Sequence, residues 1–292
     1  MRIGVVFPQT EIGADAGAVR AYAEHVEGLG LTHLLAYDHV VGADPEIHVG
    51  WDGPYDVHST FHEPLVMFGY LAAVTTSLEL VSGILILPQR QAVLVAKQAA
   101  EVDLLSGGRL RLGIGLGWNA VEYEALGEDF STRGRRCEEQ VDLMRRLWTE
   151  KTLTYRGKFH HVTAAGLAPL PMQQPIPVWF GAFSPRACRR TGRLADSWFP
   201  MVGPGPQLDE ALKLVRQAAI EAARDPRQHR HGGPSFLAGQ RARAGGRIAR
   251  MGQRRSFSSV YQHDGRWFGV GRRSPRRISD CGRSCQNIRW LM

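Results

Sequence analysis

Asp38 and His39 stand side by side at the point where a short apolar stretch of the sequence ends. A carboxylate next to an imidazole can bind the polar edge of a ring or move a proton, because histidine changes charge near neutral pH. The same two residue types also occur in a turn that carries a surface histidine. The sequence leaves both interpretations open, and Asp38 and His39 are its catalytic candidates.

Gly113, Gly115 and Gly117 alternate with apolar residues just before Trp118. Side chains alternate across a strand, so these three glycines share one face. Glycine weakens a strand and often marks the close approach of a ligand or of another backbone. A flat aromatic cofactor on that face would explain the pattern, and so would tight helix packing. The spacing is not a dinucleotide fingerprint, because Trp118 occupies the place of the third glycine.

Small residues from Gly181 to Ser184 lead into a helix that is predicted to begin at Pro185. Free backbone N–H groups at a helix N-terminus suit a phosphate. An ordinary serine cap followed by proline explains the same residues equally well. Both interpretations remain open for this segment.

The sequence predicts no metal site. His58 and His62 have the His-x-x-x-His spacing that can bind a metal on a helix, but no third ligand is evident. Cys281 and Cys285 have the ligand type for zinc, but they lie in an aperiodic segment and are discounted.

Strands and helices alternate along residues 1–223, and the candidate residues follow the ends of strands. Near-continuous apolar strands between helices indicate a parallel sheet covered by helices. Six such units fit a (β/α)8 TIM barrel, which takes about 250 residues, better than an open doubly wound sheet. The loop 42–63 and the loop-rich insertion 151–175 interrupt the pattern. The predicted strands are 3–7, 34–37, 78–87, 109–116, 176–180 and 198–201, and the predicted helices are 16–29, 64–74, 92–105, 135–149, 185–195 and 208–222.

The tail, residues 224–292, does not continue this pattern, so strands seven and eight of a barrel are missing or replaced. Residues 1–223 hold 20 Lys and Arg against 25 Asp and Glu, whereas the tail holds 16 Arg against three Asp. An Arg- and Gly-rich aperiodic composition is expected of a frame shift in GC-rich coding DNA. A disordered tail and a nucleic-acid-binding arm are the alternatives, and of these the nucleic-acid partner is the one we favour least.

Composition predicts a cytoplasmic protein without a membrane segment. The 43% hydrophobic and 22% charged residues are ordinary for a globular chain. The longest apolar stretch, around residues 81–87, falls far short of the roughly 20 residues that span a bilayer. The N-terminus is interrupted too soon for a signal peptide, and four cysteines make no disulfide scaffold.

Several short motifs, in this order and at these intervals, resemble the bacterial luciferase-like monooxygenase superfamily. The likeness is strongest to the actinobacterial branch that uses the deazaflavin coenzyme F420, and it covers residues 1–224. The motifs are Ser82–Arg90, Ala96–Gln98, Leu105–Arg109, Gly113–Trp118, Leu147–Trp148, Tyr155–Phe159, Pro175–Gly181 and Ala195–Trp198.

The resemblance implies a barrel that holds a reduced flavin or deazaflavin at the strand ends, with Asp38 and His39 near the ring. It implies a non-proline cis peptide bulge around Gly83 that backs the ring. It also implies that Gly115 and Gly117 let the ring lie flat and that the segments after strands five and six hold the phosphate. The implied cofactor-binding residues are Ser82, Gly83, Ile84, Gly115, Gly117, Trp118, Gly181, Ala182, Phe183, Ser184, Met201 and Val202.

Four functions compete on this sequence. The leading hypothesis is hydride transfer between reduced coenzyme F420 and a small organic substrate held by the loops 42–63 and 151–175. The close alternative is an FMN-dependent monooxygenase in which reduced flavin activates dioxygen. The others are a nucleic-acid binder that uses the arginine tail, and an inactive remnant with an open barrel. The resemblance also makes a homodimer an expectation.

Overall fold

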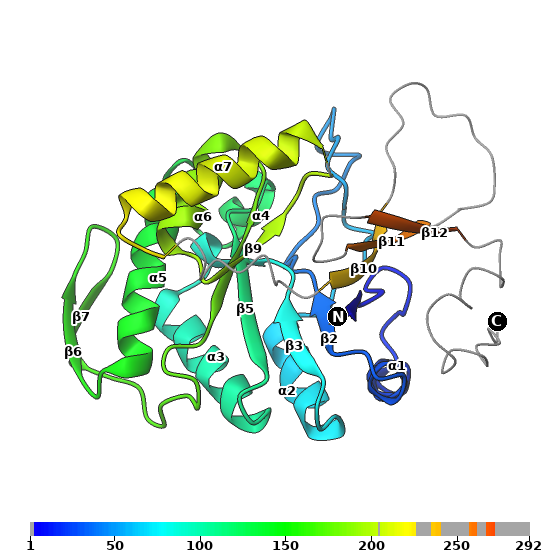
Figure 1. The fold of residues 1–292 in the computed structure, drawn as a ribbon, viewed down its shortest axis with the longest axis horizontal. Coiled ribbons are helices and arrows are strands. Elements are labelled where there is room, and N and C mark those ends of the chain that lie inside the picture. The colour runs from blue at the N-terminus through cyan, green and yellow to red at the C-terminus, as the bar shows by residue number, and fades with distance from the viewer. Residues whose placement is uncertain (1–2, 204, 226–234, 241–256, 262–266, 272–292) are drawn as a thin grey trace.

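The computed structural model describes residues 3–203 and 205–225 and three later strands, at 235–240, 257–261 and 267–271 (Figure 1). The strands are β1 (Ile3–Val6), β2 (His33–Ala36), β3 (Glu79–Ser82), β4 (Leu85–Ile86), β5 (Leu110–Gly115), β6 (Leu153–Arg156), β7 (His161–Ala165), β8 (Val178–Ala182), β9 (Ser197–Pro200), β10 (Ser235–Gln240), β11 (Phe257–Tyr261) and β12 (Trp267–Gly271). The α-helices are α1 (Ala16–Gly28), α2 (Pro64–Val74), α3 (Ala92–Leu105), α4 (Ala120–Ala125), α5 (Arg133–Thr149), α6 (Pro185–Leu194) and α7 (Pro206–Glu221), and short 3-10 helices span Leu87–Gln89 and Phe130–Thr132.

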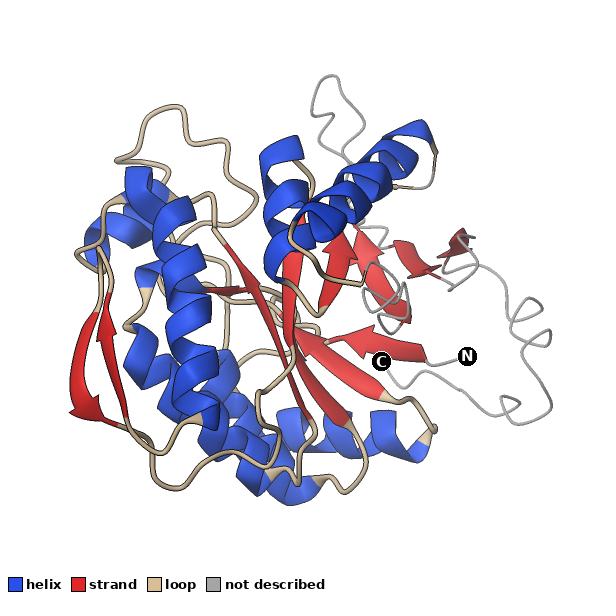
Figure 2. Cartoon of the chain, turned by 60° about the vertical axis from the view of Figure 1, so that its left-hand side comes forward, coloured by secondary structure: helices blue, strands red, loops and turns tan. Residues whose placement is uncertain are grey.

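A ten-stranded sheet runs in the order β12-β11-β10-β1-β2-β3-β5-β8-β9, with β4 paired to β5. The strands from β10 and β1 through to β9 are parallel, whereas β11 and β12 are antiparallel. Figure 2 shows the helices on the outer side of a strongly curved sheet. The predicted α/β architecture with a parallel, barrel-type sheet is therefore confirmed, and its parallel strands form a half-barrel.

Side chains pack on both faces of this sheet, as expected for buried parallel strands. Leu34, Leu80 and Leu112 belong to the large cluster that also contains the buried residues of α2, α3 and α5. The next residues along two of these strands, Leu35 and Val81, instead belong to a separate inner cluster with Trp179. Because side chains alternate, one set packs beneath the outer helices and the other fills the barrel interior. Because the strands are parallel, their carboxyl ends lie at the same rim.

The predicted strand 78–87 is broken into β3 and β4 by a bulge. Leu80 pairs with Leu110 and Leu85 pairs with Ile114, so five residues advance against four on β5. The non-proline cis peptide expected here is wrong. Among the described residues the cis peptides precede Pro169 and Pro175. The strand is turned here by the one-residue bulge with trans peptides.

Two elements inside predicted loops were missed. Helix α4 begins after Asn119, whose side chain accepts a hydrogen bond from the N–H of Val121. The insertion 151–175 contains the antiparallel pair β6–β7, which lies beside α5 (Figure 1). Both are too short for periodicity to reveal them.

Three strands within residues 224–292 were also not predicted. Strand β10 lies parallel to β1, where the last strand of a closed barrel would stand, and β11 and β12 extend the sheet antiparallel. Among the described residues of the tail, these three strands therefore stand in place of two further strand–helix units. The boundary at residue 223 stays a prediction, and Cys281, Cys285 and the arginine clusters lie outside the described residues.

In the part of the chain that is described, no helix is both long enough and apolar enough to cross a bilayer. The cytoplasmic location remains a prediction from composition.

Candidate active site

The carboxyl ends of five neighbouring strands meet at one rim. Asp38 follows β2, Ile84 lies in the bulge between β3 and β4, and Trp118 follows β5. Phe183 follows β8 and Met201 follows β9. The topology thus brings the ends of these segments to the rim at which parallel barrels place their active sites.

The Asp38 carboxylate is buried, and both of its oxygens accept hydrogen bonds. It is 2% exposed, and it accepts the N–H of Ile86 at 2.8 Å and the guanidinium of Arg90 at 2.7 Å. Arg90 also donates to Glu63 at 2.9 Å, and Glu63 caps α2 by accepting the N–H of Val66. Asp38 therefore joins β2 to β4 and to the start of α2, and it does not point at a ring on the rim.

Burial raises the pKa of the Asp38 carboxyl, while Arg90 and the N–H of Ile86 oppose that rise. Burial also lowers the pKa of Arg90, but the carboxylates of Asp38 and Glu63 outweigh it and the pKa is raised. A carboxylate held by a cation and an N–H is well suited to a structural role, because both of its oxygens already have partners.

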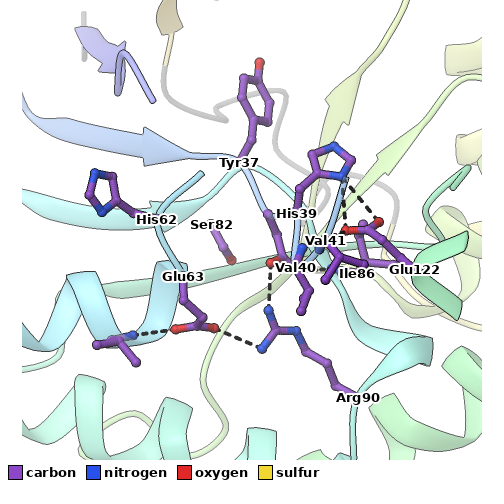
Figure 3. A network of polar contacts seen from close by, with 12 residues as sticks. Tyr37, His39, Val40, Val41, His62, Glu63, Ser82, Ile86, Arg90 and Glu122 are labelled. Carbon is purple, nitrogen blue, oxygen red and sulfur yellow. Dashed lines mark hydrogen bonds and ion pairs between the residues drawn. The ribbon is translucent and has the colours of Figure 1, made fainter. Parts of the chain in front are cut away.

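His39 faces a different carboxylate, Glu122 on α4 (Figure 3). Its Nδ1 lies 3.3 Å from each Glu122 oxygen, and Glu122 Oε1 also accepts the N–H of Val40 at 2.6 Å. The Glu122 side chain is completely buried, whereas that of His39 is 11% exposed. The carboxylate–imidazole pair expected from adjacent residues exists, but its carboxylate comes from 83 residues further along the chain.

Aromatic rings surround His39. The ring centres of Phe61, Tyr55 and Trp118 lie 4.7, 5.0 and 5.5 Å from the His39 ring, and Trp51 contacts Trp118. Tyr55 and Phe61 belong to the loop 42–63, which therefore folds over the end of β2. A cavity of about 170 Å³ opens between this loop, His39 and the start of α4. It is smaller than the roughly 300–1,000 Å³ of typical ligand pockets, so it suits a small molecule better than a whole cofactor.

The glycine face of β5 was expected to be open to a ring, but isoleucine side chains cover it. A Cβ on Gly115 would lie 2.8 Å from Ile84 Cδ1, and a Cβ on Gly181 would lie 2.5 Å from Ile84 Cγ2. Gly117 is crowded in the same way by Ile86. These glycines admit the isoleucines of the bulged strand, so a ring would contact half-buried Ile84 instead of the glycines themselves.

Tyr37 adds a neutral phenol beside the bulge. A Cβ on Gly83 would lie 2.8 Å from its ring, and burial raises the pKa of Tyr37 to about 12. The Ser82 hydroxyl donates to the carbonyl of Gly113 at 2.8 Å. The Ser82 hydrogen bond to β5 and the Tyr37 ring packed against Gly83 therefore fix the bulge, and Ile84 is its outward residue.

Ser184 caps α6, since its hydroxyl accepts the N–H of Ala187 at 3.3 Å. The N–H of Met201 donates to the carbonyl of Ala182 at 3.3 Å, which ties the ends of β8 and β9 together. Phe183 and Met201 are 69% and 55% exposed. A phosphate site formed by residues 181–184 with Met201 and Val202 stays a prediction.

Sequence reasoning missed Glu122, Arg90 and the aromatic residues of the loop. Glu122 follows Asn119 with the spacing of a capping box, in which the glutamate would turn back to its own helix. It instead reaches the backbone and ring of residues 39–41. In the described residues no three metal-ligand side chains gather, and His62 lies against the carbonyl of Gly13.

The luciferase-like monooxygenase family model matches residues 1–244. The chain belongs to this family. A protein of Mycobacterium tuberculosis is 35% identical over 164 residues, which are 56% of each chain. The FMNH2-dependent dimethylsulfone monooxygenase of Pseudomonas putida is 33% identical over 141 residues, which are 47% of this chain and 39% of that enzyme. The chain therefore spans little more than half the length of this mycobacterial relative, and less of the monooxygenase.

Solved structures show the same fold. An F420-dependent secondary alcohol dehydrogenase in complex with an F420–acetone adduct has a TM-score of 0.63 at 20% identity, covering 78% of this chain and 66% of that one. A riboflavin lyase with modified FMN has a TM-score of 0.65 at 20% identity, covering 82% and 62%. The solved structures that share this fold thus include an F420-dependent dehydrogenase and an enzyme with modified FMN.

Proposed function

We propose that this protein is an oxidoreductase that transfers a hydride between coenzyme F420 and a small organic substrate. The observation that carries the proposal is the rim itself. Half-buried Ile84 stands out of the bulge over two glycines, and His39 ends the neighbouring strand within an aromatic cluster.

The residues present fit such a cofactor. The outward face of Ile84 offers an apolar surface for a planar ring, and Gly115 and Gly181 leave room beneath Ile84 so that it need not project further. The neutral hydroxyl of Tyr37 and the outward nitrogen of His39 offer polar contacts at the ring edge. When bound, the deazaflavin supplies the hydride chemistry.

The chain's own residues then bind and orient the substrate. The cavity of about 170 Å³ between His39 and the loop 42–63 suits a molecule of a few heavy atoms. Tyr55 and Phe61 give this cavity an aromatic wall, and Asp56, Ser59 and Asn119 add polar groups. A small alcohol or ketone matches this mixed lining, because it combines an apolar body with one polar group that needs a hydrogen-bond partner.

An FMN-dependent monooxygenase is the second candidate. It is favoured by the similarity to the dimethylsulfone monooxygenase, whose name specifies FMNH2. An apolar surface such as that of Ile84 backs a flavin as well as a deazaflavin, so the relative affinity for the two cofactors distinguishes this candidate from the first.

Titration of the full chain with each cofactor tests the proposal, and quenching of the fluorescence of Trp118 and Trp51 is the signal. We expect saturable binding of coenzyme F420, at least about tenfold tighter than that of FMN. Tighter binding of FMN would instead support the monooxygenase, and no binding of either would overturn both candidates. Ile84→Glu should abolish the binding, whereas Ile220→Glu, a matched change at an exposed position on α7, should leave it intact.

A further inference from the structure

Glu122 is the carboxylate that contacts the candidate catalytic histidine, and no feature of the family match assigns it a role. It lies on α4, a helix of six residues, with its side chain completely buried. Its oxygens lie 3.3 Å from His39 Nδ1, and Oε1 accepts the N–H groups of Val40 and Val41 at 2.6 and 3.4 Å. One side chain thus holds both the ring and the following backbone.

The neighbours of Glu122 fix its position. Asn119 caps the helix through the N–H of Val121 at 3.0 Å. The hydroxyl of Tyr123, the next residue after Glu122, donates to the carbonyl of Leu116 at 2.6 Å. The carboxylate therefore approaches His39 from a short helix that is capped by Asn119 and tied through Tyr123 to the residue after β5.

The contact also determines which nitrogen of His39 carries the proton. A carboxylate only accepts hydrogen bonds, so the ring nitrogen that faces it must be a donor. In the neutral ring this makes Nδ1 the N–H and leaves the lone pair on Nε2. Nε2 points away from Glu122 (Figure 3), and it has no hydrogen-bond partner within the described residues.

We propose that Glu122 is a positioning residue that holds His39 with its Nε2 lone pair facing the rim, so that His39 exchanges the proton of the substrate hydroxyl. This inference rests on the proposed function. In alcohol oxidation the carbon gives its hydride to the oxidised deazaflavin, and the hydroxyl proton passes to Nε2. In the reverse direction the imidazolium returns that proton to the oxygen. The Glu122 carboxylate stabilises the imidazolium formed in between.

Substitution Glu122→Gln separates this role from simple anchoring of the loop. The amide oxygen can keep the bond from Val40, while the NH2 group takes the place of Oε2, 3.3 Å from Nδ1. The NH2 group there competes with the remaining oxygen, which also lies 3.3 Å from Nδ1, so the preference for an Nδ1–H should weaken and the population with the proton on Nε2 should rise. Glu124→Gln, at an exposed position on the same helix, is the matched control.

The test is nitrogen NMR of the histidine-labelled full chain, with the His39 signals assigned by a His39→Asn variant. We expect the Nδ1–H tautomer in the unsubstituted protein and in Glu124→Gln, and a shift toward the Nε2–H tautomer in Glu122→Gln. An Nε2–H tautomer in the unsubstituted protein, or no change in Glu122→Gln, overturns the inference. Thermal unfolding checks that each variant is folded.

A second measurement separates this inference from the cofactor assignment. Glu122→Gln should bind coenzyme F420 within about twofold of the unsubstituted protein, while kcat on small secondary alcohols falls about 10- to 100-fold. If the unsubstituted protein binds no F420, the proposed function fails and the tautomer result alone decides the role of Glu122. If binding is retained but kcat is unchanged, the proton-exchange role is wrong.

Discussion

At the scale of single residues, two adjacent side chains at the end of β2 have separate tasks. Asp38 points inward to Arg90 and the N–H of Ile86, whereas His39 lies among aromatic rings beside Glu122. Consecutive side chains of an extended segment point to opposite sides, so one of these two side chains must point into the protein interior. The two adjacent side chains therefore have different partners, and a catalytic role for Asp38 and His39 stays a prediction.

The first prediction concerns Asp38 as a structural residue. Asp38→Asn removes the charge that partners a buried guanidinium, and we expect the free energy of unfolding to fall by about 3–5 kcal/mol. Denaturant unfolding measures this change. Glu210→Gln, in an exposed pair with Lys213, should cost less than about 1 kcal/mol. A loss at Asp38 as small as that of the control would contradict the structural role.

The second prediction concerns the close packing beneath the rim. In Gly181→Ala the new methyl group would lie 2.5 Å from Ile84 Cγ2, so Ile84 must move. We expect about 1–3 kcal/mol of destabilisation from overpacking, together with weaker cofactor binding. Gly69→Ala, in open space on α2, should instead stabilise the protein by about 0.5–1 kcal/mol. Thermal unfolding and cofactor titration of both variants check this, and unchanged binding in Gly181→Ala would argue against Ile84 as the ring's support.

Among the elements, the turn of the β6–β7 hairpin is fastened to α5 by the carboxylate of Glu139. Glu139 accepts the N–H groups of Lys158, Phe159 and His160 at 2.7–2.9 Å, and it also contacts His160 Nδ1 at 2.8 Å. Burial by itself raises the pKa of Glu139, but the hydrogen bonds from His160 and from the backbone outweigh it and hold the pKa below its usual range. The hairpin is therefore fastened by an ionised group.

The third prediction is a pH dependence at this junction. A carboxyl whose folded-state pKa is lowered contributes stability above its unfolded pKa of about 4.3, and that contribution is lost as the pH falls through the folded value. Glu139→Gln should therefore cost about 1.5–3 kcal/mol at pH 7, and the difference from the unsubstituted protein should shrink below about pH 4. Unfolding curves across this range measure it. Glu101→Gln, in an exposed pair with Lys97, should show no such convergence, and a constant difference for Glu139→Gln would refute the interpretation.

At the scale of the whole molecule, the described sheet remains open. Strand β10 covers one side of β1, and among the described strands β9 and β12 form the two edges. An exposed strand edge offers unpaired N–H and C=O groups to other chains. The segment after residue 225 therefore matters to stability even though its composition is unlike that of a barrel.

The fourth prediction follows from this pairing. A chain ended after residue 225 loses the parallel partner of β1, and we expect its Tm to fall by about 5–10 °C with aggregation visible in light scattering. A chain ended after residue 271 keeps all the described strands and is the control. A 1–225 chain as stable and as monodisperse as the full chain would show that β10 adds nothing to the sheet.

The strand–helix alternation, the parallel sheet and the shared rim could be predicted from the sequence, because they follow from local periodicity and from the ends of strands. The pairing of Glu122 with His39 and the packing of Ile84 against the glycine face could not be predicted in this way. Those contacts join segments that periodicity places on separate elements, and packing sets their side-chain directions. The bulge between β3 and β4 has the same origin, since pairing with β5 creates it.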